Sequence, residues 1–179
     1  FVKFSYSNAS RFFYNFYTTR ENYLLMNKIA IYLNNVKPYI QNVVDNIELP
    51  DKFISLHFRF GDDYMGTQIL NKNNKHILNN LIKWLKKHNN YNYPLIIMCD
   101  NENHEVIKIL KKCFTIKFTS EFYNENVMKS FYKDISIANF LIEKKICEKA
   151  SIFIGSITST VSVHIQYNNF INYKPYNNY

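Results

Sequence analysis

The sequence predicts an α/β fold in which a Rossmann-like parallel sheet is flanked by helices. Short apolar runs and amphipathic helical patterns alternate four times between residues 53 and 167. The apolar runs are nearly continuous, as strands covered on both faces require, whereas strands with one solvated face alternate apolar and polar residues. Four strands that are each followed by a helix therefore predict a parallel sheet with helices on both faces.

The length and composition predict one domain. The chain has 179 residues, 47% of them hydrophobic, which suffices for a single buried core. We expect one domain over residues 1–179, with a leading segment and helices over 1–50, the core over 51–168 and a polar tail over 169–179. The chain opens on Phe1, with no basic and apolar leader and no apolar run long enough to cross a bilayer. These features predict a soluble piece of a longer chain, without a membrane span.

The charge balance favours an anionic ligand. Lys and Arg total 22 against 14 Asp and Glu, a net charge of +8 at pH 7, which suits a nucleotide, a phosphosugar or a nucleic acid. No zinc-binding spacing, arginine-rich segment or aromatic RNA-binding signature supports the nucleic acid. The three cysteines, Cys99, Cys113 and Cys147, form neither a CxxC motif nor a Cys/His metal pattern. We therefore expect no nucleic-acid partner and no metal site.

The first predicted elements lead into the central strand. Apolar residues recur at helical intervals over residues 21–46, and Pro38 lies inside this stretch, so we expect two helices that meet near Pro38. The segment FISLHF, residues 53–58, is apolar and rich in aromatic and β-branched residues, which predicts a buried strand. The aromatic-rich opening segment up to Thr19 is compatible with either a strand or a coil.

Two helices and two strands come next along the chain. The segment KHILNNLIKWLKKH, residues 75–88, carries a broad apolar stripe and predicts an amphipathic helix. The short apolar run PLIIMC, which Asp100 stops, predicts a strand. The segment HEVIKILKKC, residues 104–113, predicts a helix whose last-turn lysines complement the helix dipole. FTIKF, residues 114–118, predicts another strand.

The last elements complete the alternation. We expect a loop over residues 119–133 and then a helix over 135–146, where apolar residues recur at helical spacing. SIFIG, residues 151–155, predicts a strand. STVSVHIQY, residues 159–167, predicts a short helix that begins in hydroxyl residues. In a sheet of this kind, ligands bind in the crevice outside the carboxyl ends of the strands.

The first candidate site lies at the end of the strand over 53–58. His57 and Arg59 are two residues apart and therefore share a face of the strand. The guanidinium of Arg59 suits bidentate contact with a phosphate, Gly61 allows a sharp turn, and Asp62 is placed to orient Arg59. An exposed ion pair between Arg59 and Asp62 or Asp63 explains the same residues equally well.

The second candidate site is FIGSITSTVS, where a strand ends and a helix begins. Gly155 ends the strand, and four hydroxyl residues crowd the helix start: Ser156, Thr158, Ser159 and Thr160. Free backbone N–H groups and the positive end of the helix dipole make such a start a phosphate site. An ordinary N-cap is the alternative, but it needs a single hydroxyl. No G-x-G-x-x-G and no Gly-Lys-Ser/Thr loop indicates dinucleotide or P-loop chemistry.

Other polar residues favour structural explanations. Asp100 is either a crevice residue at a strand end or the N-cap of the following helix. Ser159 with His57 is a poor hydrolase pair, because no G-x-S-x-G elbow surrounds the serine. Four further histidines are expected to be surface or structural residues: His76, His88, His104 and His164.

Two segments together resemble a known family. HFRFGDD, residues 57–63, supplies H-x-R at a strand end. IEKKICEKASIFIGSITSTVSVHI, residues 142–165, supplies an acidic residue, an I-C pair, F-I-G and S-T-x-S. In this order they resemble the GDP-fucose protein O-fucosyltransferases, most closely the branch that modifies thrombospondin-type repeats. The second segment is specific, whereas H-x-R-x-G-D also occurs in other fucosyltransferase groups.

The resemblance implies a GT-B architecture of two Rossmann-like halves, with this chain as the C-terminal, donor-binding half. It assigns seven residues to the GDP-fucose pocket: His57, Phe58, Arg59, Glu143, Ser159, Thr160 and Val161. By this resemblance Arg59 binds the β-phosphate, and His57 and the Phe58 backbone line the same pocket. Glu143, where Asp is usual, helps to bind guanine. The segment from Ser159 to Val161, where Phe is usual at the last position, cradles phosphate.

The resemblance also implies a reaction. It is an inverting transfer of fucose to a protein Ser/Thr hydroxyl, without a metal or other cofactor, in which Arg59 has the catalytic role of stabilising the departing GDP. The acceptor would be a small folded repeat, and the compartment the lumen of the endoplasmic reticulum. The base belongs to the missing N-terminal half, so we expect this chain alone to be inactive. The alternatives are a glycan-directed fucosyltransferase, another GDP-sugar transferase and a non-catalytic nucleotide-sugar-binding module.

Overall fold

A computed structural model of the chain describes residues 36–60, 75–89, 92–124, 135–155, 159, 161–162, 164–165 and 176–178. Its elements are, in order, α3 (Pro38–Asp45), β1 (Ile54–Phe58), α5 (Lys75–His88), β2 (Leu95–Cys99), α6 (Glu105–Lys111), β3 (Ile116–Phe118), the 3-10 helix η1 (Thr119–Phe122), α8 (Ile135–Lys149), β4 (Ile152–Gly155) and β5 (Tyr176–Asn178). Backbone at Val161, Ser162, His164 and Ile165 is also helical.

The described strands form one parallel sheet. Their order is β3-β2-β1-β4-β5, and every neighbouring pair is parallel. The chain therefore winds outward from β1 to β3 and then returns to the other side of β1. From β1 the chain continues toward one edge of the sheet, and from β4 it continues toward the other edge. In an open α/β sheet the ligand crevice forms between two such neighbouring strands.

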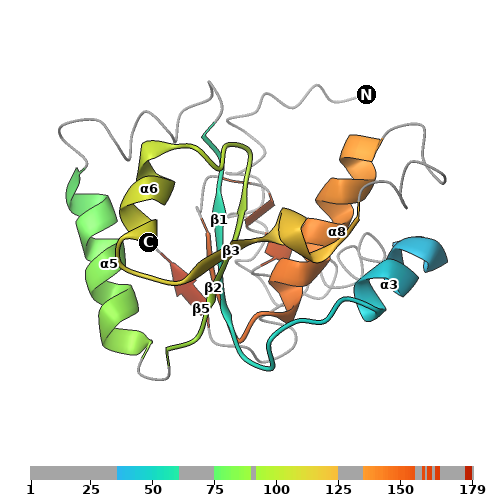
Figure 1. Ribbon diagram of the computed structural model, residues 1–179, viewed down its shortest axis with the longest axis horizontal. Coiled ribbons are helices and arrows are strands. Elements are labelled where there is room, and N and C mark those ends of the chain that lie inside the picture. Colours follow the sequence, from blue (N-terminus) through green and yellow to red (C-terminus); the bar gives the residue numbers. More distant parts are fainter. Residues whose placement is uncertain are drawn as a thin grey trace, which may run out of the picture.

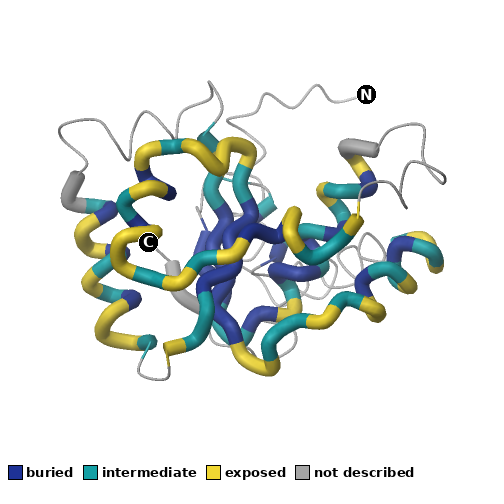
Figure 2. Tube along the Cα trace, viewed as in Figure 1, coloured by how far each residue is buried: buried dark blue, intermediate teal, exposed yellow. Residues whose placement is uncertain are grey.

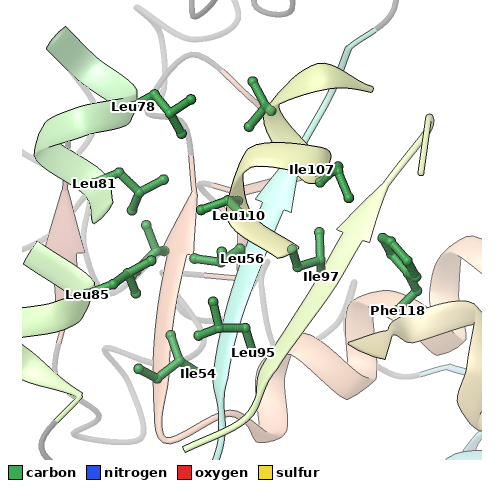
Figure 3. Close-up of a cluster of buried hydrophobic side chains, with 12 residues drawn as sticks. Ile54, Leu56, Leu78, Leu81, Leu85, Leu95, Ile97, Ile107, Leu110 and Phe118 are labelled. Carbon is green, nitrogen blue, oxygen red and sulfur yellow. The ribbon is translucent and has the colours of Figure 1, made fainter. Parts of the chain in front are cut away.

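Helices cover both faces of the sheet, as the sequence predicts (Figure 1). On one face, α5 and α6 pack through Leu81, Leu85 and Leu110 onto Leu56 and Ile97 of the central strands, and Figure 3 shows these side chains interdigitating. On the other face, α3 and α8 form a second buried cluster with β2. The central strands are consequently the most deeply buried part of the described chain, as the dark tube in Figure 2 shows.

Some elements differ from the sequence prediction. Pro38 begins α3 as one of its first residues, where its missing N–H costs nothing; the predicted helix before it lies outside the described residues. The predicted loop over 119–133 starts with η1, in which Glu121 accepts a hydrogen bond from the backbone N–H of Phe118. Strand β5 lies in the predicted polar tail, where the sequence indicated no strand. Its pairing with β4 uses main-chain hydrogen bonds, which require no apolar pattern.

No helix among the described residues is both long and apolar enough to cross a membrane. The helices instead have one face against the sheet and another toward solvent. In α5, for example, Leu85 is fully buried, whereas Lys86 and Lys87 are exposed.

Truncation of the Leu56 side chain on the central strand β1 should destabilise the fold strongly. Leu56 is fully buried in the cluster shared by β1, α5 and α6. We expect Leu56→Ala to lower the free energy of unfolding by about 2–5 kcal/mol, because the change leaves a cavity between layers that cannot collapse. Urea unfolding measures this loss. Lys83→Ala, on the exposed face of α5, is the control and should change stability by less than about 0.5 kcal/mol.

Candidate functional site

Two segments that are far apart in the sequence meet where β1 and β4 end. His57 on β1 lies opposite Gly155, the last residue of β4, in the parallel pairing of these strands. The Nδ1 atom of His57 lies 2.8 Å from Oγ of Ser162, which belongs to the helical segment after β4. Both side chains are buried. This hydrogen bond joins the H-x-R segment to the S-T-x-S segment.

Glycine at position 155 makes this contact possible. A Cβ atom at Gly155 would lie 2.4 Å from Oγ and 2.7 Å from Cβ of Ser162, and 2.9 Å from the ring of Phe153. All three distances are shorter than real Cβ contacts. The helical segment therefore crosses directly over the end of β4, and the missing side chain brings Ser162 within reach of His57.

The helix start after β4 is organised by hydroxyl groups. The backbone N–H of Ser162 points to Oγ of Ser159 at 3.4 Å, a long contact of the N-cap type. Val161 packs against the buried cluster of Met98, Cys147, Phe153 and Ile165, so its backbone N–H is the group that it can offer to an anion. Thr160, Ser156 and Thr158 lie outside the described residues.

His57 is neutral at physiological pH. Burial lowers the pKa of His57 to about 4, while nearby Asp100 raises the pKa and Arg59 lowers it by smaller amounts. A neutral imidazole carries one proton, and the hydroxyl of Ser162 can pair with Nδ1 in either tautomer, because a hydroxyl both donates and accepts. The electrostatic effects on His57 also place Arg59 and Asp100 in its neighbourhood.

Asp100 connects the ends of β1 and β2. Its Oδ1 atom accepts a hydrogen bond of 2.7 Å from the backbone N–H of Phe60, the residue after Arg59. The N-cap of α6 is His104, whose Nδ1 accepts from the N–H of Val106. The N-cap interpretation of Asp100 is therefore wrong, and its interpretation as a crevice residue stays a prediction. The suggested partners of Arg59, Asp62 and Asp63, lie outside the described residues.

Glu143 on α8 holds the segment after β3. One carboxylate oxygen accepts a hydrogen bond of 2.8 Å from the hydroxyl of Thr119, and the other accepts one of 2.7 Å from the hydroxyl of Tyr123. Glu143 therefore has a fixed orientation beside the carboxyl end of the sheet, between α8 and η1.

The described residues also include thiols and side chains of the kinds that bind metals. They contain no group of three or more His, Cys, Asp or Glu side chains that could hold a metal ion. Burial raises the pKa of Cys99 and of Cys147 to about 12, which keeps both thiols protonated and unreactive. His164 is partly buried among α8 residues, and its pKa is lowered to about 4, mainly by burial.

The sequence singled out His57, Asp100 and the hydroxyl-rich segment but did not predict the contacts made by Ser162 and Asp100. Ser162 is the last serine of S-T-x-S, and its helical position three residues after Ser159 turns it toward β1. Asp100 was considered, but its contact with Phe60 depends on the pairing of β1 with β2. Neither partner can be read from local sequence.

Comparison with known proteins shows a fold. No family model matches the chain, and no curated protein matches it. Among solved structures it is similar to the crystal structure of POFUT1 in complex with GDP, with 13% identity and a TM-score of 0.52. The match covers 92% of this chain and 51% of that chain. The protein therefore has a Rossmann-like α/β fold similar to one half of a GT-B fucosyltransferase, and it spans about half the length of that relative.

A side chain at position 155 should disrupt the contact between β4 and the following helix. We expect Gly155→Ala to lower the free energy of unfolding by about 1–3 kcal/mol, because Ser162 and Phe153 must move to accept the methyl group. Urea unfolding gives the stability, and the NMR signals of the His57 ring report whether its contact with Ser162 is lost. Unchanged stability together with unchanged His57 signals would contradict the geometry described here.

The two shielded histidines should make the fold sensitive to acid. The pKa values of His57 and His164 are lowered from 6.5 to about 4 in the folded chain, so the unfolded chain takes up protons first as the pH falls. Stability should be complete above pH 6.5 and should fall between pH 6.5 and about 4. His57→Gln and His164→Gln should each flatten this dependence in urea unfolding at several pH values. The same replacement at exposed His88 is the control, and three equal slopes would refute the explanation.

Proposed function

We propose that the chain is the donor-binding half of an inverting, metal-independent fucosyltransferase that uses GDP-fucose and modifies a protein Ser/Thr hydroxyl. The observation that carries the proposal is the hydrogen bond between His57 and Ser162, since it brings the H-x-R and S-T-x-S segments into contact. The likeness in fold to POFUT1, a structure solved with GDP, supports the same assignment.

Binding of the diphosphate is the proposed task of the two strand ends. Arg59 follows the last residue of β1 and is exposed, so its guanidinium can form bidentate, charge-assisted hydrogen bonds with phosphate oxygens. The backbone becomes helical at Val161, and the first N–H groups of a helix have no intrahelical partner and lie at the positive end of its dipole. Together they supply positive potential where fucose leaves and negative charge develops on the β-phosphate.

His57 is proposed to act as a neutral hydrogen-bonding group in this pocket. Because burial disfavours its charged form, His57 contributes a directional hydrogen bond and no charge. Ser162 engages Nδ1 and so fixes the orientation of the ring, which leaves Nε2 for the nucleotide. The backbone of Phe58, the last residue of β1, lines the same pocket in this proposal.

Glu143 is proposed to select guanine. A guanine base presents adjacent N–H donors, and a carboxylate is a suitable paired acceptor for them. The hydroxyls of Thr119 and Tyr123 already fix the carboxylate, so little side-chain entropy remains to be lost on binding. The longer Glu, where Asp is usual in the family that the sequence resembles, sets the carboxylate further from α8.

The acceptor side of the reaction is proposed to lie in a second Rossmann-like half. The resemblance implies that this half supplies the catalytic base and most of the groove for a small folded repeat. The chain alone should therefore bind GDP-fucose without transferring fucose. The proposed compartment is the lumen of the endoplasmic reticulum, in keeping with a protein acceptor that is modified after folding.

Calorimetric titration with GDP tests this function. We expect Arg59→Ala to weaken GDP binding by about 10–100-fold, which corresponds to the roughly 1.5–3 kcal/mol of hydrogen bonds to a charged group. Arg59→Lys should lose less, because the charge remains while the bidentate geometry is lost. Lys83→Ala removes the same charge from the exposed face of α5 and should leave GDP binding unchanged.

Parallel titrations separate the alternatives. UDP should bind much more weakly than GDP if Glu143 selects guanine, and GDP-mannose should compete poorly if the pocket is built for fucose. Equal GDP affinity of wild type and Arg59→Ala would reject the proposal. So would tight binding of single-stranded RNA with a steep salt dependence.

A further inference from the structure

Phe60, the residue directly after Arg59, is held by groups from two other elements. Its backbone N–H donates to Oδ1 of Asp100 at 2.7 Å, just beyond the end of β2. Its ring stacks on the imidazole of His104, with centroids 3.8 Å apart and planes at 9°. The ring of Phe58 stacks on Phe60 as well, at 5.4 Å and 20°. We call these contacts of Phe60 with Asp100 and His104 the Phe60 clamp.

The clamp acts where the sheet no longer fixes the chain. The last paired residue of β1 is Phe58, which lies opposite Cys99 of β2. Arg59 and Phe60 therefore follow the last rung of the ladder, and their backbone angles are not set by strand pairing. A long side chain amplifies small backbone rotations, so the position of the Arg59 guanidinium depends on how firmly the backbone is held on both sides of it. Anchoring Phe60 fixes the backbone on the C-terminal side of Arg59, as strand pairing fixes it on the N-terminal side.

The two residues that hold Phe60, Asp100 and His104, are themselves well anchored. His104 is the N-cap of α6, and its Nδ1 accepts a hydrogen bond of 3.3 Å from the N–H of Val106. Burial lowers the pKa of His104, which keeps the ring neutral and Nδ1 available as an acceptor. Asp100 follows Cys99 directly at the end of β2. The clamp therefore holds the chain after β1 against two rigid elements, β2 and α6.

We propose that Asp100 and His104 are positioning residues that hold Arg59 ready for the donor diphosphate by clamping Phe60. The inference rests on the proposed function, since it assigns Arg59 to the diphosphate. The gain is preorganisation, because a guanidinium already in place loses less conformational freedom when the ligand binds.

The charge of Asp100 should be dispensable for this role. The clamp needs an acceptor for the N–H of Phe60, and an asparagine at the same position offers a carbonyl oxygen in the same place. A negative charge close to a bound diphosphate opposes binding, whereas a neutral amide does not. Asp100→Asn and Asp100→Ala therefore separate the hydrogen bond from the charge.

GDP titration of these variants tests the clamp. We expect Asp100→Ala to weaken GDP binding by about 3–10-fold, as the loss of one ordering contact predicts, and Asp100→Asn to bind as tightly as wild type or more tightly. In an Arg59→Ala background, Asp100→Ala should cause no further loss, because it acts through Arg59. Equal losses with and without Arg59, or equal weakening by Asn and Ala, would overturn the inference.

The stacking of His104 on Phe60 has a matched control in α5, where His88 stacks on Trp84. His104→Ala should weaken GDP binding because it removes the ring from Phe60. His88→Ala removes an exposed imidazole that stacks on Trp84 at 4.3 Å and should leave GDP binding unchanged. Equal effects of the two variants would contradict a special role for His104.

A second measurement keeps the clamp testable apart from the proposed function. Backbone amide order parameters at residues 59 and 60, measured by NMR without ligand, should fall in Asp100→Ala and stay at wild-type values in Asp100→Asn. Unchanged order parameters in Asp100→Ala would reject the clamp whether or not GDP binds. Reduced order in a chain that does not bind GDP would retain the clamp and reject the proposed function.

Discussion

The site depends on one buried hydrogen bond between His57 and Ser162 across the end of β4. It forms because Gly155 has no side chain to keep the following helix away from the sheet. Strands β1 and β4, whose ends lie beside this bond, flank the point where the winding of the sheet reverses. Through this bond the strand end that precedes Arg59 lies beside the helical segment of Ser162, and we propose that the two bind one anionic ligand.

The charged and neutral groups of the site have different surroundings. His57 is buried and uncharged at neutral pH, so it can set distances without attracting or repelling charge. Arg59 is exposed, and the residue after it, Phe60, is bound by Asp100. Glu143 is fixed by two hydroxyl groups. The chain thus combines a rigid polar interior with an accessible cation, as preorganised sites for charged ligands generally do.

Local sequence patterns predicted most of the fold and part of the site. The strands β1, β2 and β4 and the helix α5 follow from apolar runs and helical spacing, because burial selects these residues. Strand β5 has no such pattern, since main-chain pairing alone places it. The contacts of Ser162 with His57 and of Asp100 with Phe60 were missed because they depend on strand register, which only the assembled sheet defines. The roles of His57, Phe58, Arg59, Glu143, Ser159, Thr160 and Val161 in binding stay predictions.

The central claim is that the strand end and the helix start hold the same diphosphate. A crystal structure of the chain with GDP tests it most directly. The account predicts phosphate oxygens within hydrogen-bond distance of both the Arg59 guanidinium and the backbone N–H groups at residues 159–161. A diphosphate bound elsewhere, or one that contacts the helix start while Arg59 points away from it, would contradict the account.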